Sequence, residues 1–432
     1  MTDELARMRD RLASRVITAT QTRSDLVRAA LRAVPRHLFL PWLPPEAAYR
    51  DDAIVTKRDA DGQGISSSSQ PAIMAIMLDQ LDLAPGQRVL EIGAGTGYNA
   101  ALIAHIVGPS GQVVTVDIDA DTAEAARSHL AGAGYPDVTV VCADGAGGYP
   151  AGAPYDRVIA TVGVSDLARA WLEQVTPDAR IVVPLDLRGT QLSVAFGQTG
   201  SGRWTSMSLV PCGFMRMRGS LAGPERTVPL QPGLSVLLPD GVRLADGQEL
   251  DAGALAAVLA EAPAVQDTDV RAGSNQVFWG LGLWLAAREP RMCRISEELP
   301  VGAGGRRRGT RRSVLARAPM RGRGWRTTLG MLDSGGIAIL TGSQVAPAPG
   351  QAPGALALSA TGFGPHGTVL ASGLAAHLQA WQEAGQPAAA GLRVDAYSRE
   401  VEGVEGVADA LDLTGDDLVI DRADTRFVVH HT

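Results

Sequence analysis

Apolar residues recur at two different periods along the chain, and the change of period predicts two kinds of structure. From Leu5 to Val16 they follow one another at intervals of three or four residues, which is the repeat of one face of an α-helix. The same spacing predicts a second helix over residues 26–34. Pro35 should end it, because proline disfavours helical backbone in the preceding residue. The chain is therefore expected to begin with a helical segment.

From residue 88 onward, short apolar runs alternate with helical segments. Strands are expected at residues 88–92, 112–116, 138–141, 157–161 and 180–184, and helices at 98–107, 122–131 and 167–174. This alternation is typical of a parallel sheet with helices on both faces. Two amphipathic strands, near 191–196 and 204–209, should complete the sheet. We therefore expect an α/β domain of the doubly wound, Rossmann-like type.

A group of prolines between residues 224 and 232 follows this pattern and predicts a domain boundary. We place the boundary between residues 225 and 226, because 432 residues exceed the size at which a single core keeps growing. The second part, 226–432, mixes an apolar segment, glycine-rich stretches and strand-like runs near its end. It is expected to be an α+β extension, and its fold does not follow from the pattern.

Composition and charge narrow the class of protein. Hydrophobic residues make up 45% of the chain and charged residues 20%, as in ordinary globular proteins. The net charge of −7 argues against a surface that neutralises nucleic-acid phosphates. The three cysteines are far apart and form no metal-ligand pattern, which indicates reduced thiols and no metal site. No secretory leader or membrane span is evident, so we expect a soluble, cytoplasmic protein.

The clearest chemical signal is a glycine-rich turn between an expected strand and an expected helix. Residues 89–98 read VLEIGAGTGY, with glycines at 93, 95 and 97. Glycine permits positive φ and close backbone approach, so this turn can wrap an adenosyl or nucleotide group at the carboxyl edge of the sheet. The spacing differs from the Gly-x-Gly-x-x-Gly of pyrophosphate-binding loops and disfavours a nicotinamide oxidoreductase. A tight structural turn without ligand is the alternative.

Acidic residues follow the next two expected strands. Asp117 comes about twenty residues after the loop, where a carboxylate can accept both ribose hydroxyls. Asp144 and Gly145 end the third strand, where an acid can meet an adenine amino group. Either aspartate alone is more often a turn-former or a helix cap. The loop and two acids at successive strand ends together indicate a nucleotide site.

Further motifs occur in order along the chain, namely PRHLFLP at 35–41, AYRD at 48–51, SQP at 69–71 and VVPL at 182–185. With these and the glycine loop, roughly the first half of the chain resembles the protein-L-isoaspartate O-methyltransferase family. The resemblance implies a class I methyltransferase fold that uses S-adenosylmethionine and releases S-adenosylhomocysteine. It also implies the cofactor-binding residues Glu91, Gly93, Gly95, Gly97, Asp117, Ile118, Asp144 and Gly145.

The resemblance also assigns the acceptor side of the site. The family's substrate loop carries a serine just before Gln-Pro, which corresponds to Ser69. Where the family usually has Gly-Gln-Thr-Ile-Ser-Gln-Pro, residues 64–71 here read GISSSSQP, so Ser68 is a second candidate for the catalytic hydroxyl. Further substrate contacts are expected from Ser66, Ser67 and Gln70. A carboxylate acceptor is already ionised at neutral pH, so the site needs to position it and needs no strong general base.

The length of the chain leaves the acceptor open. The serine run and the long tail resemble methyltransferases of actinobacterial ribosomal-peptide clusters (lanthipeptides and graspetides), which act on aspartate in macrocyclised peptides. We therefore expect methyl-esterification of such an aspartate, leading to a succinimide and then to isoaspartate, with the tail selecting the peptide. The alternatives are a conventional isoaspartate repair enzyme and a cofactor-binding scaffold without turnover. The arginine run at 306–312 is either a clamp for an acidic peptide or a solvated loop.

Overall fold

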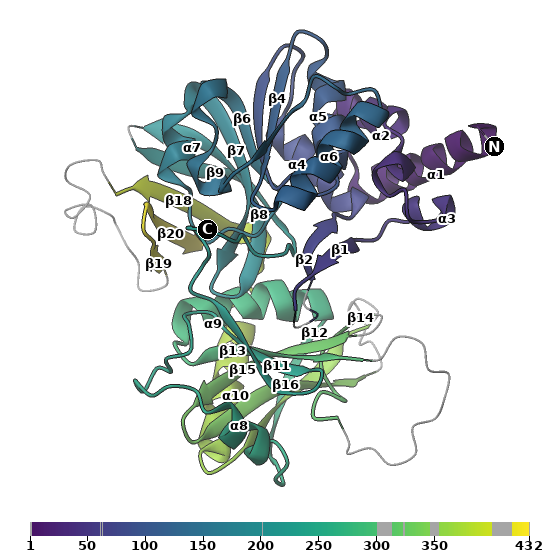
Figure 1. The fold of residues 1–432 in the computed structure, drawn as a ribbon. Coiled ribbons are helices and arrows are strands. Elements are labelled where there is room, and N and C mark those ends of the chain that lie inside the picture. Colours follow the sequence, from purple (N-terminus) through teal and green to yellow (C-terminus); the bar gives the residue numbers. More distant parts are fainter. Residues whose placement is uncertain are drawn as a thin grey trace.

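The computed structural model describes residues 2–60, 62, 64–200, 202–299, 313–322, 325–345, 354–399 and 417–431. In these residues the chain forms two bodies, one around a ten-stranded sheet and the other around an eight-stranded sheet (Figure 1). The arginine run at 306–312 lies outside the described residues. None of the helices in the described part is long and apolar enough to cross a membrane.

The first body contains the predicted parallel sheet. Its parallel strands run in the order β5-β4-β3-β6-β7, with bounds β3 Arg88–Ile92, β4 Gln112–Asp117, β5 Thr139–Cys142, β6 Tyr155–Ala160 and β7 Val175–Leu187. The connecting helices are α5 (Tyr98–Val107), α6 (Ala120–Gly132) and α7 (Arg169–Glu173). Two antiparallel strands, β8 (Thr190–Gly200) and β9 (Arg203–Pro211), extend the sheet beyond β7. The expected Rossmann-like fold is confirmed.

Helices from the N-terminal segment cover one face of this sheet (Figure 1). They are α1 (Thr2–Thr20), α2 (Asp25–Ala33), the short α3 (Pro45–Ala48) and α4 (Pro71–Leu81), with a 3-10 turn at Arg36–Phe39. The Ser24 side chain caps α2 by accepting from the Val27 amide. Apolar side chains of these helices form one core with α5, including Val16, Leu31, Leu78 and Ile103. This layer buries one face of the sheet, with Val89, Val113 and Ile159 among its strand residues.

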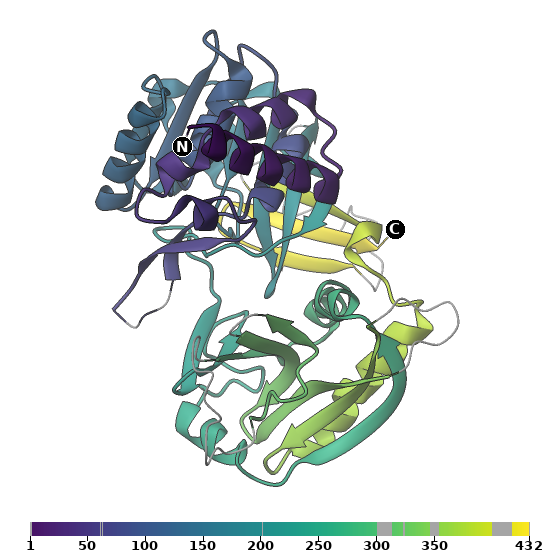
Figure 2. The same cartoon turned by 90° about the vertical axis from the view of Figure 1, so that its right-hand side faces the viewer.

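The last three strands return to the first sheet, as Figure 2 shows. They are β18 (Leu392–Ser398), β19 (Leu418–Asp421) and β20 (Thr425–His431). β18 pairs antiparallel with β9, placing Ala396 opposite the buried Trp204. The expected division between residues 225 and 226 assigns these strands to the second body, whereas the structure places them in the first. Pairing between strands so far apart in sequence leaves no trace in the local pattern.

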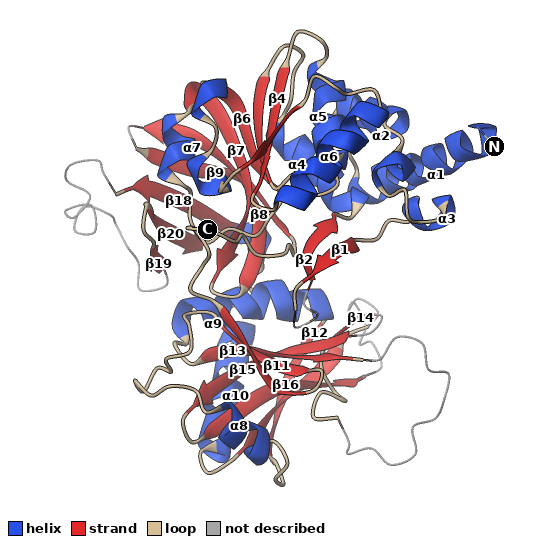
Figure 3. Cartoon of the chain, viewed as in Figure 1, coloured by secondary structure: helices blue, strands red, loops and turns tan. Residues whose placement is uncertain are grey.

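The intervening residues form the second body, which is α+β (Figure 3). Its sheet runs in the order β10-β11-β13-β15-β16-β17-β12 and is antiparallel throughout, with β14 pairing beside β15. The strand bounds are β10 Arg226–Gln231, β11 Leu234–Leu238, β12 Ala264–Ala272, β13 Met292–Glu298, β14 Met320–Gly322, β15 Trp325–Asp333, β16 Gly336–Gln344 and β17 Leu356–Phe363. The helices are α8 (Ala252–Val258), a π-helical turn at Gln276–Leu281, α9 (Gly282–Arg288) and α10 (Gly367–Glu383). We call residues 226–391 the inserted domain.

The two bodies share a continuous apolar core. Leu187 and Leu192, which flank the β7–β8 turn, belong to the same buried cluster as Leu281 and Leu285 of the inserted domain. At the turn itself, the Arg188 guanidinium pairs with Asp240 at 2.6 Å. The inserted domain is therefore packed against the end of the first sheet, beside the site described next.

Candidate active site

The glycine loop lies at the carboxyl end of β3 and is held in a conformation that side chains would prevent. Gly93 and Gly95 have φ values of +100° and +51°, a region that residues with a Cβ rarely adopt. A Cβ on Gly93 would lie 2.8 Å from Thr161 Oγ1, and one on Gly95 would lie 3.2 Å from the Ser67 carbonyl oxygen. The loop thus needs glycine at both positions, and its backbone borders the cavity described below.

Asp117 stands beside this loop at the end of β4, as predicted. Its Oδ2 accepts a hydrogen bond of 3.1 Å from the Gly95 amide, and its Oδ1 accepts one of 3.1 Å from the Asp119 amide. Gly93, Gly95, Asp117 and Ile118 all line one cavity, together with Gly145 from the end of β5. The structure therefore brings together five of the eight residues expected to bind the cofactor.

Asp144 turns away from that cavity. Its two carboxylate oxygens accept hydrogen bonds from the Ala146 amide at 3.0 Å and the Ser220 amide at 2.8 Å. Burial alone would raise the pKa of Asp144. The two backbone hydrogen bonds outweigh burial, so the pKa of Asp144 lies below its ordinary value. Asp144 thus caps the turn at Gly145–Gly147, which is the structural role that short acids commonly take at strand ends.

Glu91 and Gly97 also lie outside the cavity lining, so their part in cofactor binding stays a prediction. Glu91 is fully buried and accepts hydrogen bonds from Asn99 Nδ2 at 2.7 Å and Thr115 Oγ1 at 2.6 Å. Alternate residues of a strand face opposite sides, and Glu91 takes the side of β3 that faces α5. Burial raises its pKa to about 7. Gly97 begins α5 and packs against Leu130 of α6.

The serine run forms one strand of a separate hairpin, β1 (Ile54–Arg58) with β2 (Gly64–Ser68). Ser66 and Ser67 line the cavity, whereas Ser68 and Ser69 do not. The Ser68 hydroxyl is buried without a hydrogen-bond partner in the described residues. The Ser69 carbonyl accepts from Arg36 at 3.1 Å. Gln70 faces away from the cavity, because its amide donates to the Asp51 carboxylate at 3.1 Å.

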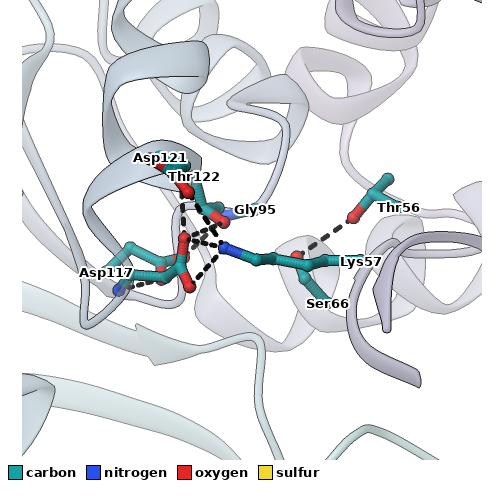
Figure 4. A network of polar contacts seen from close by, with 8 residues as sticks. Thr56, Lys57, Ser66, Gly95, Asp117, Asp121 and Thr122 are labelled. Atoms are coloured by element: carbon teal, nitrogen blue, oxygen red, sulfur yellow. Dashed lines mark hydrogen bonds and ion pairs between the residues drawn. The ribbon is translucent and has the colours of Figure 1, made fainter. Parts of the chain in front are cut away.

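Lys57 connects this hairpin to the start of α6, close to Asp117 (Figure 4). Its ammonium lies 2.7 Å from both carboxylate oxygens of Asp119 and 3.3 Å from Asp121. Hydrogen bonding to Lys57 lowers the pKa of Asp119 to about 2. On the same strand, the Thr56 hydroxyl donates to Ser66 at 3.1 Å. We call the Lys57–Asp119 contact the hairpin latch.

The space enclosed by the loop, Asp117, the hairpin and residues 215–218 is named the loop cavity. It encloses only about 70 Å³, well below the roughly 300 Å³ at which ligand sites usually begin. Its lining is nevertheless chemically suited to an adenosyl group, with a glycine backbone beside a carboxylate. Outward movement of the hairpin or of the 215–218 segment would enlarge this space.

Comparison with known proteins matches the elements that build this cavity. Residues 7–220 match the family model described as protein-L-isoaspartate(D-aspartate) O-methyltransferase. A protein-L-isoaspartate O-methyltransferase of Hyperthermus butylicus is 38% identical over 225 residues, covering 50% of this chain and 91% of that protein. One of Methanopyrus kandleri is 38% identical over 214 residues, covering 49% and 92%. The chain belongs to the protein-L-isoaspartate O-methyltransferase family.

A solved structure named protein-L-isoaspartate O-methyltransferase is also similar, with a TM-score of 0.48 and 22% identity over 90% of this chain and 96% of that one. Proteins of the family are S-adenosylmethionine-dependent enzymes that methylate isoaspartyl or D-aspartyl residues of proteins. The family match ends at residue 220, just before β10 begins the inserted domain at Arg226.

In this family member a second, larger cavity adjoins the first. It encloses about 770 Å³ and is lined from both bodies, by residues that include Gln191 and Phe214 from the first and Phe278, Trp279 and Trp325 from the inserted domain. Ile65 and Met215–Arg218 line both cavities. We call this space the junction cavity. It is large enough for several residues of a peptide.

Charged side chains on the junction cavity wall comprise three acids and four arginines. Arg216 is paired with Glu225, whose side chain is only 6% exposed. Burial, followed by the neighbouring Asp186 carboxylate, raises the pKa of Glu225 above its ordinary value. With four arginines against three acids, the wall carries one formal positive charge in excess when all three acids are ionised.

Several residues of the site were not predicted from the sequence. Lys57, Asp119 and the Met215–Arg218 segment carry no motif, and Thr161 and Val162 follow an expected strand without a distinguishing feature. Lys57 is the only lysine in the sequence, which is the one feature that could have drawn attention to it. Its role depends on a partner 62 residues away, which no local pattern identifies.

Proposed function

We propose that this chain transfers the methyl group of S-adenosylmethionine to the free carboxylate of an isoaspartyl residue in a protein or peptide. The main supporting observation is that the segment matched by the family model also lines the loop cavity. Residues 7–220 match the methyltransferase family, and Gly93, Gly95 and Asp117 of that segment border one cavity. The product of the proposed reaction is a methyl ester, with the cofactor released as S-adenosylhomocysteine.

The residues of the loop cavity fit this cofactor. The Gly93 to Gly97 backbone leaves room where a Cβ would collide with Thr161 or Ser67, and the Asp117 carboxylate is fixed beside it to accept the ribose hydroxyls. Ile118 offers an apolar surface next to Asp117. When bound, the cofactor supplies a methyl group made electrophilic by the positive sulfur that carries it.

The acceptor needs no residue that removes a proton. An ionised carboxylate oxygen forms the new O–CH₃ bond while the S–CH₃ bond breaks, and the acceptor's negative charge and the sulfonium's positive charge disappear together. The protein's task is then to hold the two groups in line. His37 is consistent with this, because its Nδ1 lies 2.7 Å from the Tyr49 hydroxyl and its ring lies outside both cavity linings.

A serine hydroxyl is proposed to orient the acceptor by donating to the carboxylate oxygen that does not react. The family motif favours Ser69 and then Ser68, whereas Ser66 and Ser67 line the loop cavity. The buried Ser68 hydroxyl has no partner among the described residues, so outward movement of the hairpin would free it to bind substrate. Alanine variants of all four serines separate these assignments. Replacement of the orienting serine should lower kcat more than it lowers cofactor affinity.

The inserted domain supports a second candidate acceptor, an aspartate in a constrained ribosomal peptide. The supporting observation is the junction cavity, whose wall is built partly by the inserted domain and opens on the same residues as the loop cavity. We propose that the inserted domain selects the peptide. Methylation of such an aspartate, followed by attack of the next backbone nitrogen and loss of methanol, would give a succinimide.

The deciding experiment is methyl transfer to paired synthetic peptides that contain isoaspartate or aspartate at the same position, in linear and macrocyclic form. Mass spectrometry should show gain of a methyl group on the isoaspartyl peptide, followed by loss of methanol. Methylation of the macrocyclic aspartyl peptide alone would favour the second candidate. Cofactor binding without transfer to any of the peptides would contradict both and support a scaffold.

A further inference from the structure

The segment from Met215 to Arg218 separates the two cavities and is fixed from behind. The Gly163 amide donates to the Met215 carbonyl at 2.7 Å, and the Met217 amide donates to the Gly163 carbonyl at 2.8 Å. This ladder of hydrogen bonds ties the segment to the chain that follows β6. Side chains two residues apart on an extended segment share a face, so Arg216 and Arg218 project to the same side.

The charge of Arg216 is already balanced. Its guanidinium pairs with Glu225. The third arginine of the wall, Arg294, is partly buried, is influenced electrostatically by Glu225 and Asp186, and donates to the Gly189 carbonyl at 3.0 Å. Arg321, farther along the wall, donates to the carbonyls of Ala318 and Ala316 at 2.9 and 2.8 Å. These three guanidinium groups are therefore occupied by protein partners.

Arg218 differs from them. Its side chain is partly buried and lines both cavities, yet it forms no hydrogen bond or ion pair with any residue that the structure describes. A guanidinium is charged at all relevant pH values and offers a planar pair of donors that matches a carboxylate. Arg218 lies where the two cavities meet, so its two parallel N–H donors are available to a bound anion.

The reacting carboxylate is a poor match for this group. Formation of the methyl ester removes the acceptor's negative charge, so a guanidinium bound to it would stabilise the substrate more than the transition state and would slow the reaction. A second carboxylate of the same peptide keeps its charge throughout. Binding such a group would hold the peptide without this cost.

We propose that Arg218 binds an acidic side chain adjacent to the acceptor residue, so that this enzyme prefers acceptor peptides with a neighbouring glutamate or aspartate. This inference rests on the proposed function. The rest of the junction cavity suits a peptide main chain, because the buried Trp279 Nε1–H has no partner in the described residues and can donate to a peptide carbonyl. Arg218 thus acts as a specificity-determining residue.

The test uses the full chain and short isoaspartyl peptides that carry glutamate, or glutamine as the neutral match, one or two residues before or after the acceptor. For the wild-type protein, glutamate at one of these positions should lower KM by about tenfold to a hundredfold, the range of a hydrogen bond to a charged group. Arg218→Gln should abolish this preference, and Arg218→Lys should restore part of it. Cofactor affinity, measured by calorimetry, is the comparison readout, and in both variants it should change less than the KM for the glutamate peptide does.

Two control variants separate a specific contact from general electrostatics. Arg321→Gln removes a positive charge from the same cavity, and Arg243→Gln removes one from an exposed site outside both cavities. Both should keep the preference for glutamate. The proposal would be overturned by equal KM values for the two peptides in the wild-type protein, or by a glutamate preference that survives Arg218→Gln. It would also be overturned if Arg218→Gln lowered cofactor affinity and left the peptide preference unchanged. Absence of any methyl transfer by the wild-type protein would instead contradict the proposed function itself.

Discussion

Asp117 is the acid most firmly placed in the loop cavity, because backbone amides of Gly95 and Asp119 hold its two oxygens. We expect Asp117→Asn to weaken S-adenosylmethionine binding by roughly 1.5–3 kcal/mol, the contribution of a hydrogen bond to a charged group. Calorimetric titration measures the change. Asp137→Asn, at an exposed position outside the loop cavity, should leave affinity unchanged, and equal affinity of Asp117→Asn and wild type would remove Asp117 from the ribose site.

Glu91 is expected to make stability depend on pH. Burial raises its pKa from 4.5 to about 7 in the folded chain, so between these values the folded state binds more protons than the unfolded state. Stability therefore falls as pH rises through this window and is constant above it. At about 1.4 kcal/mol per pKa unit, the loss is at most about 3.5 kcal/mol.

Glu91→Gln should remove this contribution, so the unfolding free energy of the variant should fall less than that of the wild type between pH 4.5 and 7.5. Urea denaturation at several pH values gives the comparison. Glu124→Gln, which alters an exposed acid on α6, should retain the wild-type slope. Parallel curves for wild type and Glu91→Gln would show that Glu91 ionises as freely in the folded protein as in the unfolded one.

The position of Glu91 also shows which properties of a single residue the sequence does not predict. The motif correctly placed Gly93, Gly95 and Asp117 at one sheet edge, because the ends of parallel strands meet there. Neighbours of Glu91 on both faces of β3 are apolar and buried, so no alternation indicated which face Glu91 would take. Asp144 was ambiguous for another reason, since a ligand contact and a turn cap require the same residue type at the same place.

At the scale of elements, the β1–β2 hairpin is the part of the site that the pattern did not predict as a hairpin. Residues 54–68 mix charged residues, glycine and serine without alternation of apolar and polar positions. Its position depends on contacts with distant residues, among them the hairpin latch. The strands and helices of the parallel sheet were predictable to within a few residues, because each carries its own apolar period.

Breaking the latch should make the loop cavity easier to enter and leave. Lys57→Met keeps the apolar stem but loses the ion pair with Asp119, so we expect bound S-adenosylmethionine to dissociate about two to five times faster, as for loss of a partly exposed ion pair. Stopped-flow displacement measures this rate. Salt should speed release from the wild type toward the variant's rate, because ions screen the pair.

Arg58→Met is the matched control, since Arg58 lies on the same strand and, among the described residues, donates to the Gly62 carbonyl. Its release rate should equal that of the wild type. If Arg58→Met accelerated release as much as Lys57→Met, the effect would come from the hairpin's own stability and the latch would have no special role.

At the scale of the whole molecule, the inserted domain divides the first body's sequence without dividing its sheet. The proline-rich segment after β9 lies where the chain passes from the first body to β10, and the family match ends nearby at residue 220. The return of β18–β20 could not be predicted, because edge strands of any sheet carry similar alternating patterns. Asp166 fixes the return by accepting from the Asp424 amide at 2.8 Å and from the Thr425 hydroxyl.

Because the first sheet includes the last three strands, a truncation after residue 225 should destabilise the first body. A chain that stops at residue 225 loses the inserted domain and also β18, which covers the edge of β9 opposite Trp204. Trp204 is 1% exposed in the full chain. An aromatic side chain of roughly 150–250 Å² contributes up to about 5 kcal/mol on burial, so we expect the 1–225 fragment to unfold at low temperature or aggregate.

Joining residues 392–432 to residue 225 through a flexible linker should recover much of that stability. Both shortened chains expose the same apolar β7–β8 turn, so their difference isolates the contribution of the returning strands. Thermal unfolding should be cooperative and occur at a higher temperature in the joined chain, which should also bind S-adenosylmethionine while losing the peptide preference of the full protein. Identical unfolding temperatures would mean that the first body is complete without β18–β20, because the edge of β9 would then need no partner.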